Sequence, residues 1–427
     1  EELDHLLKTA KKPFSVIVVD IRNFKSINDT YGHPIGDALL KSCGERLAGL
    51  IDTKSSIARL GGDEFGVIAP QSKKGVDATV LGDKILEAFE QPFEIDGRRI
   101  FATASVGIVA HDPSIDAGEP VSADILLQNC DLALYKAKED RSGKGASQLF
   151  EPAMRSRLKQ RREMELDLKA ALDAGEFELY YQPFVDIAEK RVSGFEALLR
   201  WNHPEKGMIS PGNFIPLAEE AGLIERLGIW CLNTACAEAA SWPETMTISV
   251  NLSAMQFKSD TLLADIDRAL ANSGLSASRL QIEVTESLFL DESDRVLDIL
   301  KQMRSRGLTV SMDDFGTGYS SLGYLSRFSF NKIKIDQSFV RDMGRAENIA
   351  IVRSVIGLSK SLKMQVIAEG IETEDQMRAL LAEGCHEMQG YFFSTPQPKE
   401  ELPRVIADIT RRWAADLEVK MDSVLAA

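Results

Sequence analysis

Two features of the sequence predict an α/β fold with a βα-barrel in the second half of the chain. In that half, short apolar runs alternate with stretches of helical period, as strands and helices do in such a barrel. Acidic or amide residues stand at the C-terminal ends of the runs, where a barrel directs side chains into one mouth. These residues are Glu196, Asn251, Glu283, Asp313, Asp314, Asp336, Glu369 and Gln389. A mouth lined with oxygen ligands predicts a site for a hard cation such as Mg²⁺, Mn²⁺ or Ca²⁺.

Length and composition predict a globular chain of two or three domains. The 427 residues are 44% hydrophobic and 27% charged, which are the proportions of a soluble protein. The net charge of −15 argues against a nucleic-acid polymer as partner, because binding a polyanion needs a broad basic surface. The apolar runs are too short to span a bilayer, so we expect no membrane contact in this segment.

The spacing of the cysteines indicates the redox compartment of the protein. Its five cysteines show no CxxC pair, which favours reduced, structural thiols in a cytoplasmic protein.

Residues 1–12 have the pattern of the end of an amphipathic helix, and no helix start signal precedes them. We therefore expect an upstream sensor domain or linker helix, so that this segment is the cytoplasmic part of a longer protein.

The first half mixes strands and helices. Residues 14–21 are an apolar, β-branched run, which predicts a buried strand. Residues 57–60 and 65–69 flank Gly61-Gly62-Asp63-Glu64, which is a hairpin signal. Residues 101–110 predict a further strand.

Helical patterns close the first half and lead into the barrel. Residues 123–138 predict an amphipathic helix, and the charged stretch 154–169 predicts a helix between the domains. The resulting domain boundaries are 1–150 for the first domain, 151–170 for the helical linker and 171–427 for the barrel.

The barrel half alternates regularly between the two periods. A helix is expected over 294–306 and a strand over 308–312, with Gly307 between them as the helix stop. The same alternation recurs at 349–362 and 364–368. The regularity supports an α/β barrel by itself.

The adjacent acids Asp313 and Asp314 are the sharpest local feature. Neighbours in a strand point to opposite faces, but the chain bends at the last residue of a strand, so both carboxylates can turn to one mouth. One carboxylate could then bridge two cations and the other bind the second, a pairing that activates water in phosphodiester hydrolysis. The alternative is an Asx-turn pair that begins a loop. Acids at the other strand ends favour the metal site.

Seven ordered segments of the barrel half together resemble the EAL domain, over about residues 161–398. They are E-A-L-L-R (196–200), N-L-S (251–253), E-V-T-E (283–286), D-D-F-G-T-G-Y-S-S-L (313–322), K-I-D (334–336), A-E-G-I-E (368–372) and Q-G-Y (389–391). The resemblance implies a TIM-like (β/α)8 barrel that hydrolyses cyclic di-GMP to linear pGpG. It also implies two Mg²⁺ or Mn²⁺ ions in each site.

The same resemblance implies roles for the matching residues. Asp313 with Asp314 would bind the second metal, and Glu369 would support the site partly through water. Lys334 would orient or deprotonate the attacking water, and two nearby cations would favour its neutral form. The ligands of the first metal would be Glu196, Asn251, Glu283 and Asp313. The remaining roles are water or phosphate contact by Gln389, anchoring of the loop 315–322 by Glu372, and substrate contact by Gln182, Leu198, Arg200, Asp336 and Tyr391.

Acids also stand at a strand end and a hairpin turn of the first domain. Asp20 ends the first strand and Asp63-Glu64 lies in the turn, so their carboxylates could hold Mg²⁺ against a triphosphate. The alternative is a tight turn that merely carries acids. The segments R-L-G-G-D-E-F (59–65), 24–37, S-V-G-I (105–108) and 131–138 resemble the GGDEF domain over residues 1–150.

The GGDEF resemblance implies an α+β domain with a largely antiparallel, nucleotidyl-cyclase palm-like sheet. Members condense two GTP molecules into cyclic di-GMP at a dimer interface, so a homodimer and GTP with Mg²⁺ are expected. Asp20, Asp63 and Glu64 match the metal and catalytic acids. The matching GTP contacts are Asn28 and Asp37 for guanine, and Lys25 and Lys138 for phosphate.

The first domain departs from the family pattern at several positions. Arg22 stands where a second acid is usual, and Glu139 with Asp140 stands where Gly-Arg is usual. The RxxD inhibition motif is absent, because Asp52 and Ser55 occupy its ends. Three functions therefore stay open: a phosphodiesterase whose GGDEF domain senses GTP or makes the dinucleotide, a cyclase with a suppressed EAL domain, and a non-catalytic cyclic di-GMP receptor.

Overall fold

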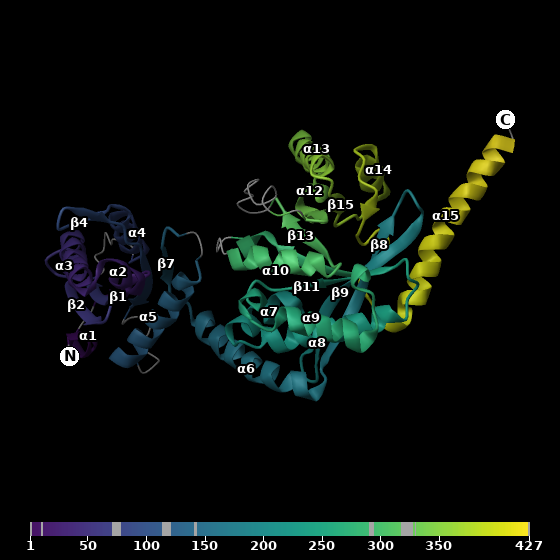
Figure 1. The fold of residues 1–427 in the computed structure, drawn as a ribbon. Helices are drawn as coiled ribbons and strands as arrows, with labels where there is room; N and C mark the ends of the chain where they lie inside the picture. Colours follow the sequence, from purple (N-terminus) through teal and green to yellow (C-terminus); the bar gives the residue numbers. More distant parts are fainter. Residues whose placement is uncertain are drawn as a thin grey trace. The chain divides into compact units, whose positions relative to one another are not determined.

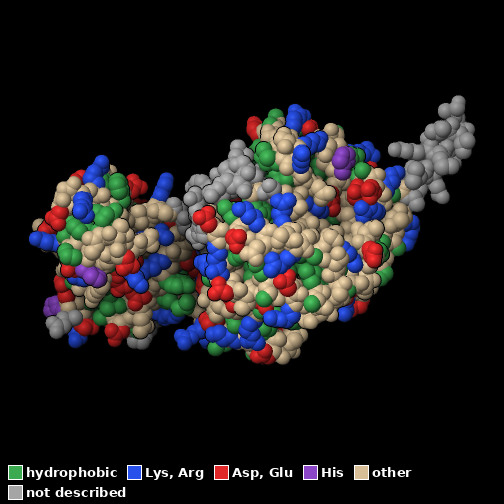
Figure 2. Space-filling view, in the orientation of Figure 1, with side chains coloured by type: hydrophobic (Ala, Val, Ile, Leu, Met, Phe, Trp, Pro, Cys, Tyr) green, Lys and Arg blue, Asp and Glu red, His purple; other side chains and the backbone are tan. Residues whose placement is uncertain are grey.

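The chain forms two compact units, Glu1–Arg162 and Glu163–Ala427 (Figure 1). The computed structural model describes residues 2–9, 12–70, 78–112, 121–140, 143–289, 294–316, 328 and 330–425. Among these residues, no helix is both long and apolar enough to traverse a bilayer. On the face shown in Figure 2, acidic and basic side chains are interspersed over both units.

A five-stranded sheet in the order β2-β3-β1-β6-β7 forms the centre of the first unit. Neighbouring strands are antiparallel except β6 and β7, which confirms the predicted α+β domain. The central strand β1 is buried along its whole length, as its apolar, β-branched sequence requires. The strands are β1 (Phe14–Ile21), β2 (Ser56–Gly61), β3 (Glu64–Pro70), β6 (Ala104–His111) and β7 (Ala146–Leu149).

Helices cover both faces of this sheet. On one face, Ile17 and Val19 of β1 share a core with α2, α3 and α4. On the other face, Val16 and Val18 pack with α1 and α5, because side chains alternate along a strand. The elements are α1 (Glu2–Thr9), α2 (Phe24–Tyr31), α3 (His33–Leu50), α4 (Ala78–Glu90), α5 (Ala123–Lys138) and the small hairpin β4 (Phe93–Ile95) with β5 (Arg98–Ile100).

The second unit is a closed barrel with helices around it (Figure 1). From β9 to β16 all neighbouring strands are parallel, whereas β8 is antiparallel to both β9 and β16 and closes the ring. The predicted TIM-like (β/α)8 barrel is confirmed, with one strand reversed. Its strands are β8 (Phe177–Asp186), β9 (Arg191–His203), β11 (Thr247–Asn251), β12 (Leu280–Thr285), β13 (Thr309–Phe315), β14 (Lys332–Ile335), β15 (Gln365–Ala368) and β16 (Glu387–Met388).

Helices alternate with these strands as the sequence pattern predicts. The helix α10 ends at Ser305, and Gly307 follows with φ 91°, a conformation that glycine adopts without strain. The helices are α6 (Pro152–Ala174), α7 (Pro211–Glu220), α8 (Ile224–Ala240), α9 (Leu262–Ser273), α10 (Asp294–Ser305), α12 (Gln337–Arg341), α13 (Ala346–Ser361), α14 (Glu374–Ala382) and α15 (Leu402–Leu425). The short elements are β10 (Gly207–Ile209), β17 (Gln397–Pro398) and the 3₁₀ turns η1 (Gln256–Lys258), η2 (Ala277–Arg279), η3 (Glu286–Phe289) and η4 (Lys399–Glu401).

The opposite ends of the barrel interior differ in chemistry. At the N-terminal ends of the strands, the buried Lys332 Nζ lies 2.8 Å from Glu387 Oε2, and Ser193 donates to Glu387 Oε1 at 2.7 Å. These groups satisfy one another, which is the arrangement that a buried ion pair needs. The C-terminal ends carry an excess of acids, and they form the candidate site.

Candidate active site at the barrel mouth

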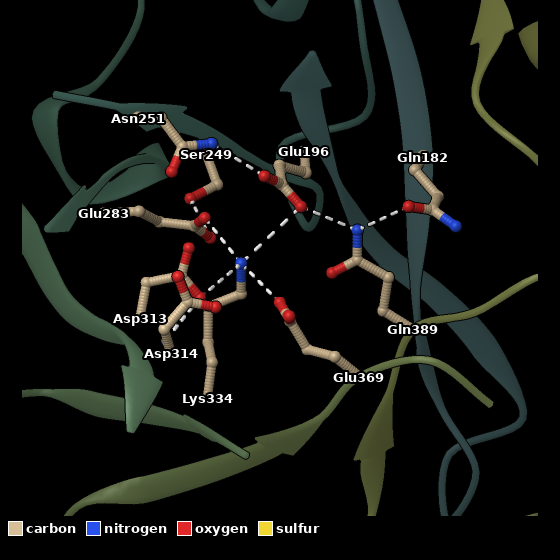
Figure 3. A network of polar contacts seen from close by, with 10 residues as sticks. All are labelled: Gln182, Glu196, Ser249, Asn251, Glu283, Asp313, Asp314, Lys334, Glu369 and Gln389. Atoms are coloured by element: carbon tan, nitrogen blue, oxygen red, sulfur yellow. Dashed lines mark hydrogen bonds and ion pairs between the residues drawn. The ribbon is translucent and has the colours of Figure 1, made fainter. Parts of the chain in front are cut away.

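The C-terminal half of the barrel brings the predicted strand-end residues together around Lys334 of β14 (Figure 3). Glu369 and Gln389 lie in the residues that follow β15 and β16. The expectation that Glu196 ends a strand is wrong. Strand β9 continues past Glu196 to His203, and this extension pairs with β8 and β10. The cluster consists of Glu196, Asn251, Glu283, Asp313, Asp314, Lys334, Glu369 and Gln389.

Four carboxylates share the single ammonium group of Lys334. The side chain of Lys334 is 2% exposed. Its Nζ lies 2.6 Å from Glu283 Oε2, 2.5 Å from Glu369 Oε1, 3.2 Å from Asp313 Oδ1 and 3.5 Å from Glu196 Oε2. Burial by itself lowers the pKa of Lys334, but the four carboxylates outweigh it and hold this pKa well above its usual value.

The carboxylates differ in how well the cluster supports their charge. Burial raises the pKa of Glu283 well above its usual value, and it raises that of Glu369 to about 8 although Lys334 opposes the shift. Burial and the adjacent Asp313 raise the pKa of Asp314 to about 6. Burial also acts on Glu196, but Lys334 and two amide donors overcome it and lower its pKa. The cluster is therefore short of positive charge.

A backbone irregularity turns Asp313 and Asp314 to the same mouth. The register between β13 and β14 shifts between Met312 and Phe315, and Asp314 has a left-handed backbone with φ 53°. Non-glycine residues rarely adopt this conformation, and such strain is concentrated at functional sites. Asp313, Asp314 and Glu369 each place a carboxylate oxygen within 4.8 Å of the others.

Amide side chains organise the other side of the mouth. Glu196 Oε1 accepts from Asn251 Nδ2 and Glu196 Oε2 accepts from Gln389 Nε2, both at 2.7 Å. Gln389 Nε2 also lies 2.9 Å from Gln182 Oε1. Within the described part of the chain, Gln389 Oε1 is buried and has no hydrogen-bond partner.

The donor set fits a hard cation. The cluster offers carboxylate and amide oxygens, which Mg²⁺ and Mn²⁺ prefer. The shortage of positive charge and the unpaired oxygen of Gln389 are also features that a bound cation would relieve.

The other predicted residues of the barrel lie at the edge of the cluster or outside it. Asp336 contacts Asp314 through a side-chain hydrogen bond and also caps α12 by accepting from Ser338 N. Arg200 Nη1 donates to the carbonyl of Leu199. Tyr391 and Glu372 are exposed, and Leu198 is half-buried on β9. Of the loop 315–322 that Glu372 is expected to hold, residues 317–322 lie outside the described residues.

Two residues near the mouth were not predicted as site residues. Ser249 of β11 is fully buried and donates to Glu283 Oε1 at 2.6 Å. Glu286 keeps both carboxylate oxygens buried, and no partner for them occurs among the residues that the structure describes. The sequence did carry a signal for Ser249. It is a polar residue within an apolar strand, and it stands two positions before Asn251, so both side chains point to the same face.

The predicted acids of the first unit also lie together. Asp20 and Glu64 are directly opposite each other in the antiparallel pair β1–β3. Lys138 Nζ lies 2.6 Å from Asp20 Oδ2. Burial raises the pKa of both acids although Lys138 opposes it, and Asp63 adds to the raised pKa of Asp20. These carboxylates could hold a cation at the end of β1.

The predicted nucleotide contacts of the first unit are more dispersed. Lys25 and Asp37 are exposed, whereas the Oδ1 atom of Asn28 is buried and unpartnered within the described chain. A Cβ atom at Gly36 would lie 1.8 Å from that oxygen, so a larger residue there would displace the Asn28 side chain. Arg22, which replaces the usual acid, donates to the carbonyl of Asp140.

Family comparisons match both units. The sequence model described as "EAL domain" matches residues 165–396, and the one described as "Diguanylate cyclase, GGDEF domain" matches residues 1–144. Among solved structures, "PaMucR Phosphodiesterase, c-di-GMP complex" is similar at 41% identity and a TM-score of 0.55. That similarity covers 56% of this chain and 99% of the solved chain.

Named relatives match along almost the whole chain. An "Uncharacterized signaling protein" of Caulobacter vibrioides is 42% identical over 93% of this chain and 48% of its own length. The "Bifunctional diguanylate cyclase/cyclic di-GMP phosphodiesterase MucR" of Pseudomonas aeruginosa is 38% identical over 92% of this chain and 57% of its own length. The chain thus spans about half the length of these relatives.

Proposed function

The chain belongs to the family that joins a GGDEF domain to an EAL domain, and we propose that its barrel hydrolyses cyclic di-GMP to linear pGpG. The observation that carries this proposal is the group of four carboxylates around the buried Lys334. A similar phosphodiesterase solved with c-di-GMP and a bifunctional relative support the same activity. A purely non-catalytic receptor would not need so many buried acids.

We propose that the mouth holds two Mg²⁺ or Mn²⁺ ions. Asp313 with Asp314 would hold the second ion, with Glu369 supporting it. When bound, the ions would supply Lewis-acid activation of water and stabilise the leaving oxygen. The residues that would hold the first ion are Glu196, Asn251, Glu283 and Asp313.

The protein's own side chains would then position the reactants. Bound cations would oppose the carboxylates that raise the pKa of Lys334, so that this side chain could orient the attacking water or take its proton. The unpaired Oε1 of Gln389 could accept a hydrogen bond from that water, or the amide group of Gln389 could donate to the phosphate. Arg200 suits a phosphate oxygen because a guanidinium donates two parallel hydrogen bonds. The full set of proposed substrate contacts is Gln182, Leu198, Arg200, Asp336 and Tyr391.

For the first unit we propose GTP binding with Mg²⁺ at Asp20, Asp63 and Glu64. The cross-strand pairing of Asp20 with Glu64 and the nearby Lys138 support such a site. The bound nucleotide would either regulate the barrel or be converted to cyclic di-GMP. We also propose a homodimer, and a cytoplasmic setting because the five cysteines are all free and buried.

A nucleotide assay tests the barrel activity. The purified chain is incubated with cyclic di-GMP and Mg²⁺, and pGpG is followed by chromatography. We expect product, and a loss of turnover of at least about a hundredfold in Glu196→Ala, which removes a proposed metal ligand. Glu347→Ala, on the exposed surface of α13, is the matched control and keeps full activity. Binding of cyclic di-GMP with no product from the wild-type chain would instead favour the receptor.

The same assay with GTP tests the first unit. A hydrolysis rate that changes with GTP supports regulation, and formation of cyclic di-GMP from GTP supports a cyclase. The double change Asp63→Ala with Glu64→Ala should remove either effect and leave basal hydrolysis intact. Sedimentation of the purified chain measures whether it is a dimer, and a monomer with full activity would contradict the proposed assembly.

A further inference from the structure

Ser249 supports the candidate metal ligand Glu283 from within the barrel. It stands two residues before Asn251 on β11, so both side chains face the interior. Its Oγ donates to Glu283 Oε1 at 2.6 Å. Ser249 is 0% exposed and Glu283 is 1% exposed, so water does not compete for this bond.

The two oxygens of Glu283 have different partners. Ser249 binds Oε1, and Lys334 Nζ lies 2.6 Å from Oε2. The hydroxyl therefore fixes the rotation of the carboxylate and directs Oε2 to the centre of the cluster (Figure 3). Groups that hydrogen-bond a metal ligand in this way orient it and tune its affinity for the ion.

A second serine on the other side of Glu283 provides an internal comparison. Ser311 of β13 is paired with Glu283 in the strand register and is 1% exposed. Its Oγ has no partner within the described residues. Two buried serines thus flank the same carboxylate from neighbouring strands, but the described hydrogen bond to it comes from Ser249.

We propose that Ser249 is a positioning residue that orients Glu283 for a divalent cation and sets the affinity of the first metal position. The inference rests on the proposed function, because cation binding by Glu283 is part of it. Loss of such a supporting partner typically weakens metal binding by about tenfold to a hundredfold. We expect the lower end of that range for Ser249→Ala, because Lys334 still contacts Glu283.

Mn²⁺ binding to the full chain, measured by titration calorimetry without nucleotide, tests the inference apart from catalysis. We expect Ser249→Ala to bind Mn²⁺ about tenfold more weakly. Ser311→Ala removes a hydroxyl of the same size from the strand on the other side of Glu283, and this hydroxyl makes no bond among the described residues, so the variant should bind Mn²⁺ like the wild type. Ser249→Thr keeps the hydroxyl and should restore most of the affinity.

The Mg²⁺ dependence of cyclic di-GMP hydrolysis gives a second readout. Ser249→Ala should need more Mg²⁺ for half its maximal rate and keep most of that rate at saturating Mg²⁺. Unchanged Mn²⁺ affinity in Ser249→Ala, or equal losses in Ser249→Ala and Ser311→Ala, would overturn the role of Ser249. Absence of Mn²⁺ binding by the wild-type chain would overturn the proposed metal function itself, and the two failures are therefore distinguishable.

Discussion

The individual acids at the barrel mouth are held in a protein interior that disfavours their charge. Glu369, Glu283 and Asp314 all have raised pKa values, with burial as the largest cause. A folded chain with such groups retains protons that the unfolded chain releases at the same pH. Divalent cations would reverse this, because they favour the ionised carboxylates.

The pH dependence of stability should therefore differ with and without metal. In EDTA, we expect the free energy of unfolding of the barrel to fall as pH rises from about 5 to 8. The raised pKa values place extra protons on the folded state, and each contributes a slope of about 1.4 kcal/mol per pH unit. Thermal unfolding at a series of pH values measures the fall.

Saturating Mg²⁺ is the control, and it should flatten this dependence. Identical curves in EDTA and in Mg²⁺ would contradict both the raised pKa values and the proposed metal site. The lowered pKa of Glu196 does not alter the expectation, because its stabilising effect is lost only below the pKa of the unfolded carboxyl.

Single residues were predicted by type more successfully than by geometry. The sequence identified the acids at the strand ends, because each follows an apolar run. It could not show that β9 continues past Glu196, because that extension depends on pairing with distant strands. The bond from Ser249 to Glu283 was likewise beyond reach, since it depends on the register between β11 and β12.

Among the secondary-structure elements, α5 and β6 come unusually close. A Cβ atom at Gly107 of β6 would lie 2.3 Å from the carbonyl oxygen of Cys130 and 2.5 Å from the amide nitrogen of Leu134. These are backbone atoms of α5, which cannot yield without movement of the helix. The same helix carries Lys138, the partner of Asp20.

We expect Gly107→Ala to destabilise the first unit by about 2 kcal/mol, because overpacking forces the helix away from the sheet. The proposed affinity for GTP should fall as well, since Lys138 moves with α5. Hydrogen–deuterium exchange measures the effect locally: peptides from β6 and α5 should exchange faster, while barrel peptides remain unchanged.

Gly49→Ala in α3 is the matched control. A Cβ atom there has no neighbour within 4 Å, so the change should leave exchange unchanged or slightly slower. Equal acceleration in the barrel peptides, or none in β6, would contradict the local clash at Gly107.

Elements were predicted well where the pattern is local. The helix over 123–138 has the predicted bounds, and the strand expected at 14–21 does too. The strand expected over 101–110 begins only at Ala104, because the edge of an apolar run does not define where pairing starts. The reversed direction of β8 was not predicted, because strand direction is set by partners far along the chain.

At the scale of the whole molecule, the five cysteines are free and buried. Burial raises the pKa of Cys43, Cys231, Cys236 and Cys385 to about 12, and that of Cys130 in the same direction. A thiol reacts as its thiolate, so these groups are protected both by access and by chemistry.

We expect no cysteine to react rapidly with Ellman's reagent at pH 8 in the folded protein. All five should react after denaturation in guanidinium, when burial is lost. The absorbance of the thiolate that the reagent releases gives the number of reactive cysteines in the folded and in the denatured protein. Rapid stoichiometric reaction of the native chain would show that one of the cores opens readily, contrary to the packing described above.

The division into two domains was visible in the sequence because two different patterns of acids precede and follow a charged helix. The first compact unit ends at residue 162, within α6, and the helical linker expected over 151–170 stays a prediction. Because α6 is one continuous helix that belongs partly to each unit, its sequence shows no break in the helical period at the boundary. Its division between two packed units therefore could not be predicted from the pattern.

The ring closure has a consequence for protein synthesis. Gln389 bonds to Gln182 and Glu196, which precede it by 207 and 193 residues. A nascent chain whose strand β16 is still inside the ribosome therefore has no closed ring. Domains mature as units during translation, so the complete mouth can assemble only after β16 and Gln389 have emerged from the ribosome. A chain that stops before β16 would therefore lack both the closed ring and the complete mouth.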